Sequence, residues 1–359
     1  MKVFRFIRES RAVQTVIYIC VMFFLILAFW NQSVFGSDEA EIFIKGEQIA
    51  RGKRLYTEIA SQHMPLMYYL SFCFSKLGVE TIAGFRGSFY ILFSILWGVI
   101  YSYFGKSLGR KQVGFYPVVY LVLVSGISNG TCILSEQLEG IGMTILFYEM
   151  IIFYKKKSIS LKDCILISLA IFISFGSAFV SAFGIFAAFL FVLLLEIRDA
   201  YCAHISISKE ILYLIKKYIT LVVIVLLPFI LLLGYYWHIH TIHDFYRWAY
   251  KFNTVVYPKY TGGYGDNVLK AFFGGITYIA KTLNITNISI TSITNCLVIF
   301  IVILFFVNHY KEYKDKLYIG CIALFIIACA TRGCFSFHGL PVVAVFSAIC
   351  ALSLSNFFP

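Results

Sequence analysis

The feature that most constrains this chain is a series of long apolar runs. The first covers residues 13–30 and contains no charged side chain. A helix needs about 20 predominantly apolar residues to cross the bilayer core. A soluble protein of 359 residues, 60% of them apolar and 13% charged, would have too little interior to bury this much apolar surface. The sequence therefore predicts an all-α polytopic membrane protein, and it excludes a soluble enzyme, a disordered chain and a coiled coil.

Ten runs are predicted to be transmembrane helices. They are residues 13–30, 85–104, 113–128, 132–154, 161–177, 178–195, 218–236, 288–307, 317–331 and 340–357. The apolar stretch 65–77 contains only 13 residues, a length typical of an interfacial or re-entrant helix. Basic residues precede the first run and no small-x-small cleavage site follows it, which predicts an uncleaved signal anchor.

The distribution of lysine and arginine predicts the orientation of these helices. If residues 65–77 do not cross, most of the 30 basic residues fall in five clusters on the cytoplasmic side, together with both chain ends. The clusters are Lys2/Arg5/Arg8/Arg11, Lys106/Arg110/Lys111, Lys155/Lys156/Lys157/Lys162, Arg198/Lys209/Lys216/Lys217 and Lys311/Lys314/Lys316. Two long loops, 31–84 and 237–287, then face outward. The formal net charge of +12 fits loops held against anionic lipid head groups, and no nucleic-acid partner is predicted.

The first outer loop contains an acidic pair, Asp38 and Glu39, shortly after the first predicted span. Ser37 is expected to be the N-cap of a helix that starts at Asp38 and ends at Gly52. Carboxylates at the start of a helix are favoured by the helix dipole, so a capped helix with solvated acids is one interpretation of this pattern. The alternative is a functional site at the membrane surface.

The acidic pair is the first of an ordered series of motifs. After it come an amphipathic helix, the sequence Gly-x-x-Leu-Tyr and the sequence His-x-Pro-Leu-x-Tyr, and then Arg86 opens the next helix and Glu136 follows a helix hairpin. The matching residues of the first loop are Asp38, Glu39, Gly52, Leu55, Tyr56, His63, Pro65, Leu66 and Tyr68. Over about residues 13–160 this series resembles the type C (GT-C) glycosyltransferases, in particular the branch of protein O-mannosyltransferases and lipid A aminoarabinose transferases.

This resemblance implies a polyprenyl-phosphate-linked sugar donor and transfer of a hexose or pentose, with inversion at the anomeric carbon, on the outer face. The acceptor hydroxyl loses a proton as it attacks, so a carboxylate must lie near it. Asp38 is expected to be this base, with Glu39 as the second catalytic residue. The departing lipid phosphate needs a cation, and the candidates are a divalent metal ion held by acids, Lys53, Arg54 and Arg86.

Further residues extend the expected substrate site. Some relatives place a lysine directly before the proline of the second motif, whereas this chain has Met64 there, after His63. His63 is therefore counted with the substrate-binding residues, and the identity of the phosphate-binding group stays open. Glu136 and Glu139 lie three residues apart, on one face of the fourth span. Glu136 is expected to face the donor or acceptor cavity, and the alternative is that both acids mark the interface in water.

The second outer loop combines histidines with aromatic and basic residues. His238, His240 and His243 have a spacing that allows a metal site, but no cysteine and no HExxH motif accompanies them. The Tyr and Trp side chains of this loop suit either a membrane-surface belt or stacking on sugar rings. Arg247 and Tyr257 are the residues of this loop that we assign to substrate binding.

The chain is expected to form an N-terminal membrane module, 1–160, with the candidate catalytic site, and a more variable C-terminal module, 161–359, with the outer loop 237–287. The leading hypothesis is a glycosyltransferase of a bacterial cell membrane, whose acceptor is a cell-surface glycan, glycolipid or protein. A transporter or flippase for a lipid-linked glycan should place its ionisable residues deep in several spans. A polysaccharide polymerase, which would lack the early Asp-Glu pair, and a structural membrane subunit are further alternatives.

Overall fold

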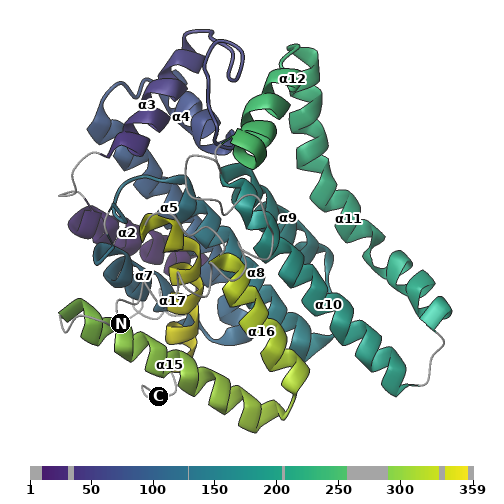
Figure 1. The fold of residues 1–359 in the computed structure, drawn as a ribbon. Coiled ribbons are helices and arrows are strands. Elements are labelled where there is room, and N and C mark those ends of the chain that lie inside the picture. Colours follow the sequence, from purple (N-terminus) through teal and green to yellow (C-terminus); the bar gives the residue numbers. More distant parts are fainter. Residues whose placement is uncertain are drawn as a thin grey trace.

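The computed structural model describes residues 10–30, 36–127, 129–203, 207–256, 290–330 and 336–354. These residues form helices joined by turns, with an isolated β-bridge between Leu55 and Ile59, so the predicted all-α class is confirmed (Figure 1). The helices are α2 (Arg11–Trp30), α3 (Ser37–Ala50), α4 (Leu66–Lys76), α5 (Ile82–Leu108), α6 (Arg110–Gly114), α7 (Tyr116–Ser125), α8 (Ser135–Lys156), α9 (Leu161–Ser177), η1 (Phe179–Ser181), α10 (Ala182–Cys202), α11 (Ile207–His238), α12 (Ile242–Phe245), the π-helix η2 (Tyr246–Val256), α15 (Ile290–Tyr313), α16 (Lys316–Cys329), η3 (Ser336–Gly339) and α17 (Leu340–Leu354).

Every predicted span coincides with one or more of these helices. Four segments of the described chain are long and apolar enough to cross a membrane: Arg11–Trp30, Ile82–Leu108, Phe179–Cys202 and Lys217–His238. By contrast, α9, α16 and α17 contain 17, 14 and 15 residues, and α8 contains three glutamates. The structure therefore supports membrane-spanning character for four segments, and the crossing of all ten stays a prediction.

The predicted span 113–128 has different bounds in the structure. α6 ends at Gly114 and α7 begins at Tyr116, so the apolar helix has only ten residues. Pro117 lies in the first turn of α7, where its missing N–H removes no helical hydrogen bond. The predicted boundary between residues 177 and 178 is confirmed, because α9 ends at Ser177 and Ala178 is extended.

α8 forms the centre of the bundle, and every residue from Ser135 to Phe153 is buried. Two glycines let it approach its neighbours closely. A Cβ on Gly140 would lie 2.9 Å from the Cβ of Ala344 on α17, and one on Gly142 would lie 2.1 Å from the Oγ of Ser174 on α9. Small residues at such contacts are typical of membrane bundles, since they let backbones pack together. α8 thereby links α9 and α17, as Figure 1 shows.

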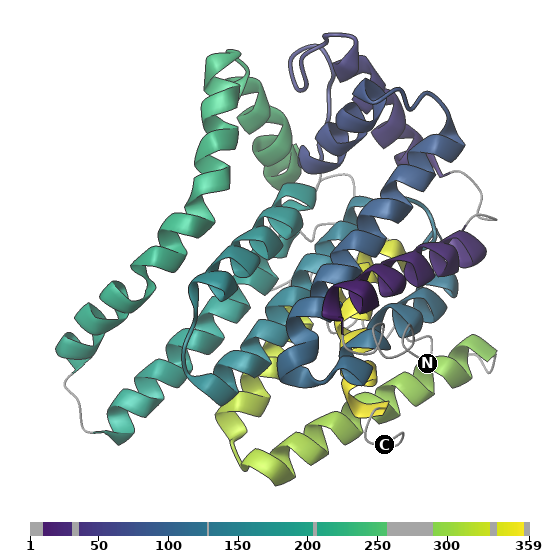
Figure 2. The same cartoon turned by 180° about the vertical axis from the view of Figure 1, so that it is seen from behind.

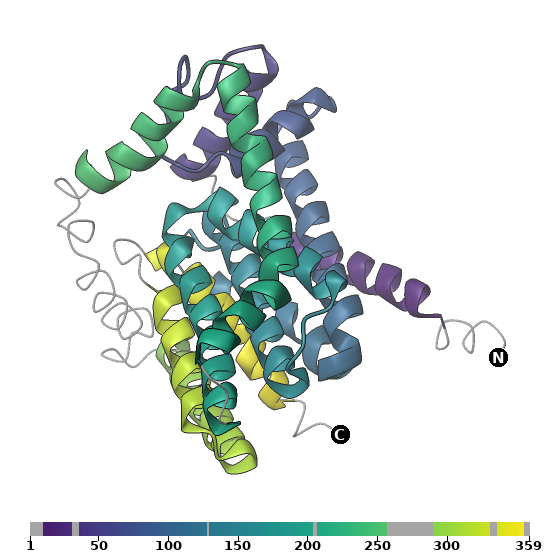
Figure 3. The same cartoon turned by 90° about the vertical axis from the view of Figure 1, so that its right-hand side faces the viewer.

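The described parts of the two predicted outer loops lie at the same end of the molecule, where α3 and α4 meet α12 (Figure 3). The hydroxyl of Thr57 donates to the Oδ2 of Asp244 at 2.8 Å, and the Tyr56 ring lies 5.3 Å from that of Phe245. Segments almost 190 residues apart in the sequence are thus joined by direct contacts. Residues 257–287 of the second loop lie outside the described residues.

The predicted cytoplasmic clusters meet at the opposite end. The Nζ of Lys157, after α8, lies 2.9 Å from the Oδ2 of Asp199 near the end of α10. Arg198 forms a further ion pair with Asp315, in the turn between α15 and α16. The last turns of α5 and α8 are joined in the same region by a hydrogen bond. This arrangement fits a common side of the membrane for the basic clusters that these turns carry.

The ends of α3 differ in how well the sequence predicts them. The helix begins at Ser37 with Gly36 at the N-cap, so the prediction of a Ser37 cap is wrong, and no side-chain hydrogen bond caps this end. The predicted end is confirmed, because Gly52 has a φ of +95°. The N–H of Gly52 donates to the carbonyl of Ile49 at 2.9 Å, and the N–H of Lys53 donates to that of Gln48 at 3.1 Å. This is a Schellman motif, which favours glycine at the left-handed position.

The apolar stretch 65–77 forms α4, which contains 11 residues. Such a helix is about 16 Å long, too short for the ~30 Å bilayer core. It packs against α3 at a position where a Cβ on Gly46 would lie 2.2 Å from the Oγ of Ser71. α4 therefore packs against α3 as a short helix, and its place at the membrane interface stays a prediction.

Candidate functional site

Glu39 and Arg86 form a buried ion pair between α3 and α5. The Nε of Arg86 donates to the Oε1 of Glu39 at 2.7 Å, and the Nη2 donates to the Oε2 at 2.8 Å. The two side chains are 0% and 8% exposed. A bidentate pair of this kind is strong and fixes the relative orientation of the groups that carry it. Two residues that the sequence assigns separately to catalysis and to substrate binding are therefore partners.

Asp38 supplies the more accessible carboxylate of the acidic pair. It is half-buried in the first turn of α3, whereas Glu39 beside it is fully buried. A Cβ on Gly36, which precedes α3, would lie 3.1 Å from the Sγ of Cys132 in the loop before α8. The loop that leads into α8 thus lies against the start of α3 and brings a third chain segment to the pair.

A second group of polar residues lies at the start of α8. Glu136 and Glu139 are 3% and 4% exposed. The Nε2 of His338, on η3, lies 3.9 Å from the Oε1 of Glu136, and the Ser135 hydroxyl donates to the Oε2 of Glu136 at 3.0 Å. Burial of both acids contradicts the alternative in which they simply face water at the interface. His338 is a residue that sequence reasoning missed, because it lies 202 positions from Glu136 in the chain.

Trp30 belongs to a cluster of aromatic rings from α5 and α7. Its ring is 6.1 Å from that of Tyr90, which follows Arg86 by one helical turn, and 6.5 Å from that of Tyr120. Glu136 lies within electrostatic range of Tyr120. The structure therefore arranges the Glu39–Arg86 pair and Glu136 around one buried aromatic cluster, at the same end of the bundle.

The basic residues of the first loop lie apart from this cluster. Lys53 and Arg54 are exposed in the turn after α3. Arg54 is bound to Glu58, which accepts from its backbone N–H at 2.8 Å and from its Nε at 3.3 Å. His63 is half-buried, and its carbonyl accepts a hydrogen bond from the hydroxyl of Tyr56 at 2.8 Å. Contacts of Lys53 or Arg54 with the Glu39–Arg86 pair are absent from the described residues.

The second sequence motif of the loop is tied to α3 through Glu41. The hydroxyl of Tyr68 donates to the Oε1 of Glu41 at 2.7 Å, and the Ser61 hydroxyl donates to that of Tyr68 at 2.8 Å. The Nζ of Lys45 lies 2.5 Å from the same Oε1. These contacts give Tyr68 of the His-x-Pro-Leu-x-Tyr sequence a structural role, since they fasten α4 to α3.

This network should make the α3–α4 contact sensitive to acid. Burial raises the pKa of Glu41, but the hydrogen bonds from Lys45 and Tyr68 and nearby positive charge together lower it below its usual value. A carboxyl with a lowered pKa stabilises the fold above its unfolded pKa of about 4.3, and this contribution is lost as the pH falls through the folded pKa. At pH values below about 4, the protein in lipid should therefore unfold at a lower temperature. Glu41→Gln should weaken this pH dependence, and identical pH profiles for the two proteins would contradict the assignment.

The described part of the second outer loop contributes few of the expected contacts. Arg247 is exposed, and its guanidinium lies 6.0 Å from the ring of Trp248. Tyr257 lies outside the described residues. Within the described ranges, no three His, Cys, Asp or Glu side chains gather so that they could hold a metal ion. Among the described residues, basic side chains are the groups that could stabilise a phosphate.

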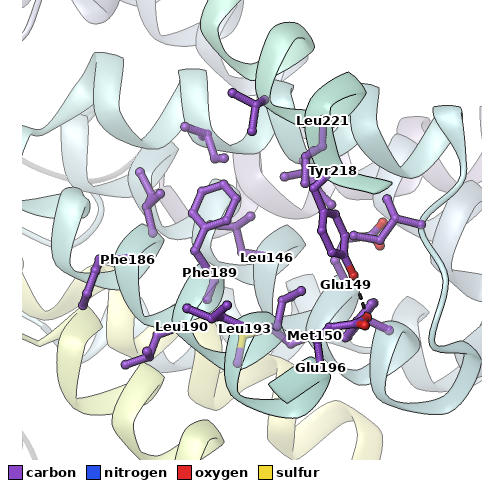
Figure 4. A pocket seen from close by; sticks show the side chains of 18 of the residues that line it. Leu146, Glu149, Met150, Phe186, Phe189, Leu190, Leu193, Glu196, Tyr218 and Leu221 are labelled. Carbon is purple, nitrogen blue, oxygen red and sulfur yellow. Dashed lines mark hydrogen bonds between the residues drawn. The ribbon is translucent and has the colours of Figure 1, made fainter. Parts of the chain in front are cut away.

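An apolar cavity of about 340 Å³ lies between α8, α9, α10 and α11 (Figure 4). Leu146 and Phe189 are typical of its lining, and the two acids that line it are Glu149 and Glu196. The Tyr218 hydroxyl donates to the Oε1 of Glu196 at 2.7 Å. The cavity contains none of the site residues that the sequence predicts, and its lining suits a hydrocarbon chain better than a sugar or a phosphate.

In comparisons with known proteins, the chain matches no protein-family model, no curated protein and no solved structure. The likeness to type C glycosyltransferases therefore depends on the order of motifs in the sequence. The geometry adds that three of these motifs, at Asp38–Glu39, Arg86 and Glu136, lie at one end of the bundle.

Proposed function

We propose that this chain is an integral-membrane glycosyltransferase that moves a sugar from a polyprenyl-phosphate donor to an acceptor hydroxyl. The observation that carries the proposal is the gathering of buried charge at one end of an apolar bundle. The Glu39–Arg86 pair joins α3 to α5, and Glu136 lies at the start of α8 beside the same aromatic cluster. Ionisable groups among membrane helices are costly, so such a concentration favours a functional site over packing alone.

In the proposed reaction, Asp38 accepts the proton of the acceptor hydroxyl as its oxygen attacks the anomeric carbon. The bond from that carbon to the phosphate oxygen breaks, and its electron pair leaves with polyprenyl phosphate. Attack from the face opposite the phosphate inverts the configuration. The Glu39–Arg86 pair positions Asp38 by holding the start of α3 against α5. We assign no cation to the leaving phosphate, because Lys53 and Arg54 follow the end of α3 opposite Asp38 and Arg86 is bound to Glu39.

The proposal includes a bacterial cell membrane, ten spans, cytoplasmic chain ends and an active site on the outer face. In a cysteine-free background, Asp38→Cys should react with an impermeant maleimide in intact cells. Lys314→Cys, at the opposite end of the molecule, should react only after the membrane is permeabilised. Labelling of position 314 in intact cells would contradict the orientation.

The activity is tested by adding a panel of polyprenyl-phosphate sugars and candidate acceptors to the purified protein in lipid. Release of polyprenyl phosphate that depends on the acceptor would support the proposal.

The carboxylates Glu149 and Glu196, which line the apolar cavity, favour a lipid-linked glycan flippase as the second candidate. A flippase would move the donor across the bilayer without releasing polyprenyl phosphate, so the same assay separates the two functions.

A further inference from the structure

A second cavity, of about 570 Å³, lies at the end of the molecule that carries the basic clusters. Its walls come from α2, α5, α8 and the beginning of α9, and Figure 2 shows α2 lying across α5 on this side. Arg86 and Lys106 both belong to α5 and are 20 residues apart, which corresponds to about 30 Å of helix. The cavity, called the basic cleft below, is therefore separate from the candidate glycosyltransferase site.

Three lysines line the basic cleft: Lys106 in the last turn of α5, Lys156 at the end of α8 and Lys162 in the first turn of α9. All three are exposed, and among the described residues neither Lys106 nor Lys162 takes part in an ion pair. The acid in the lining, Asp163, accepts hydrogen bonds from the Tyr103 hydroxyl and from a backbone N–H at the start of α9. The lining therefore has a net charge of +2.

Hydroxyl groups lie in the same part of the cleft as the lysines. They belong to Ser102, Tyr103, Ser107, Ser158 and Ser160. The Nζ of Lys156 lies 3.3 Å from the Oγ of Ser107, which places an ammonium and a hydroxyl side by side. Charged N–H donors combined with O–H donors are the groups that bind phosphate oxygens in proteins.

Away from the lysines, the lining becomes apolar. Ile95, Val99, Ser102 and Lys106 of the lining recur every three or four positions, so they share one face of α5. Ile95 and Val99 are 44% and 38% exposed, and Ile19 of α2 lines the same space. The distance along the helix from Lys106 to Ile95 is about 16 Å. The cleft therefore has a basic end and an apolar end, arranged along the direction of a predicted span.

We propose that the basic cleft binds an anionic phospholipid, with its phosphate among the three lysines and one acyl chain along the α2–α5 wall. A free phosphate would gain nothing from the apolar wall. A zwitterionic lipid would bring its own cation toward the lysines. The bound lipid would hold α2 against the ends of α5, α8 and α9, and this role does not depend on glycosyl transfer.

The test measures lipids retained by the full-length protein, extracted from membranes that contain phosphatidylglycerol and phosphatidylcholine, by native mass spectrometry. A cleft variant is compared with a control variant that loses the same charge from exposed lysines outside the cleft at the same end. Each lysine near an anionic lipid surface contributes roughly fivefold to affinity. The cleft variant is K106Q/K156Q/K162Q, and the control variant is K111Q/K155Q/K311Q. The preference for phosphatidylglycerol should fall roughly 100-fold in the cleft variant and should change little in the control variant.

Val99→Trp gives an independent test, because it fills the apolar end without changing any charge. It should lower retention of phosphatidylglycerol while far-ultraviolet circular dichroism shows the helical content of the parent. Millimolar inorganic phosphate should not displace the lipid. Unchanged lipid preference in the cleft variant, equal losses in the cleft and control variants, or displacement by inorganic phosphate would each overturn the proposal.

Discussion

Replacement of Asp38 by Asn is expected to reduce sugar transfer about 10²- to 10⁴-fold, the usual contribution of general-base catalysis. Asn keeps the size of Asp and most of its hydrogen bonding, but it cannot accept the proton of the acceptor hydroxyl. The buried contact between Glu39 and Arg86 does not involve Asp38, so the fold should be preserved. Binding of the polyprenyl-phosphate donor should change much less than transfer, because the base contacts the acceptor.

Glu47→Gln is the matched control for this variant. Glu47 lies on the same helix, and it forms a surface ion pair with Arg51 in which the two side chains are 37% and 72% exposed. The control makes the same kind of acid-to-amide change and should keep full transfer.

Glu136→Gln should also impair transfer, since Glu136 is buried beside the candidate site. Near-normal transfer by a folded Asp38→Asn protein would remove the main reason to assign this activity.

Much of the fold can be predicted from the sequence, because each apolar helix is specified by its own residues. The boundary near residue 178 and the termination of α3 at Gly52 depend on local conformation, and the structure confirms both. Hydropathy does not predict the break between α6 and α7, because it is continuous there, although Gly114 and Pro117 mark the break. Hydropathy measures how apolar a segment is, and it carries no information about which backbone turns interrupt the segment.

The site is less accessible to sequence reasoning than the fold. Motif order identifies Glu39, Arg86 and Glu136, but their partners are set by tertiary packing. Glu39 and Arg86 are 47 positions apart, and no periodicity of the chain pairs them. His338 lies beside Glu136 only because η3 and α17 pack against α8. The two cavities cannot be predicted from the sequence either, because each is formed by three or more helices that come together only in the fold.

The buried ion pair should dominate the stability of the end of the bundle that carries α3. Glu39→Gln or Arg86→Gln alone leaves one buried charge without its partner, which typically costs about 3–5 kcal/mol. The double variant removes both charges, so its loss should be clearly smaller than the sum of the two single losses. Reversible unfolding in one lipid and denaturant system measures these differences. The exposed pair Glu47–Arg51 is the control, and the corresponding variants should each lose no more than about 1 kcal/mol.

The same variants separate two roles for Glu39. If Glu39 only positions the start of α3, the double variant should recover transfer together with stability, because the neutral pair restores the packing without the charge. If Glu39 or Arg86 takes part in the reaction, transfer stays low in the double variant although most of its stability has returned. Single variants as stable as the parent protein would contradict the view that this pair holds α3 against α5. The comparison therefore separates the structural contribution of the Glu39–Arg86 pair from its contribution to the reaction.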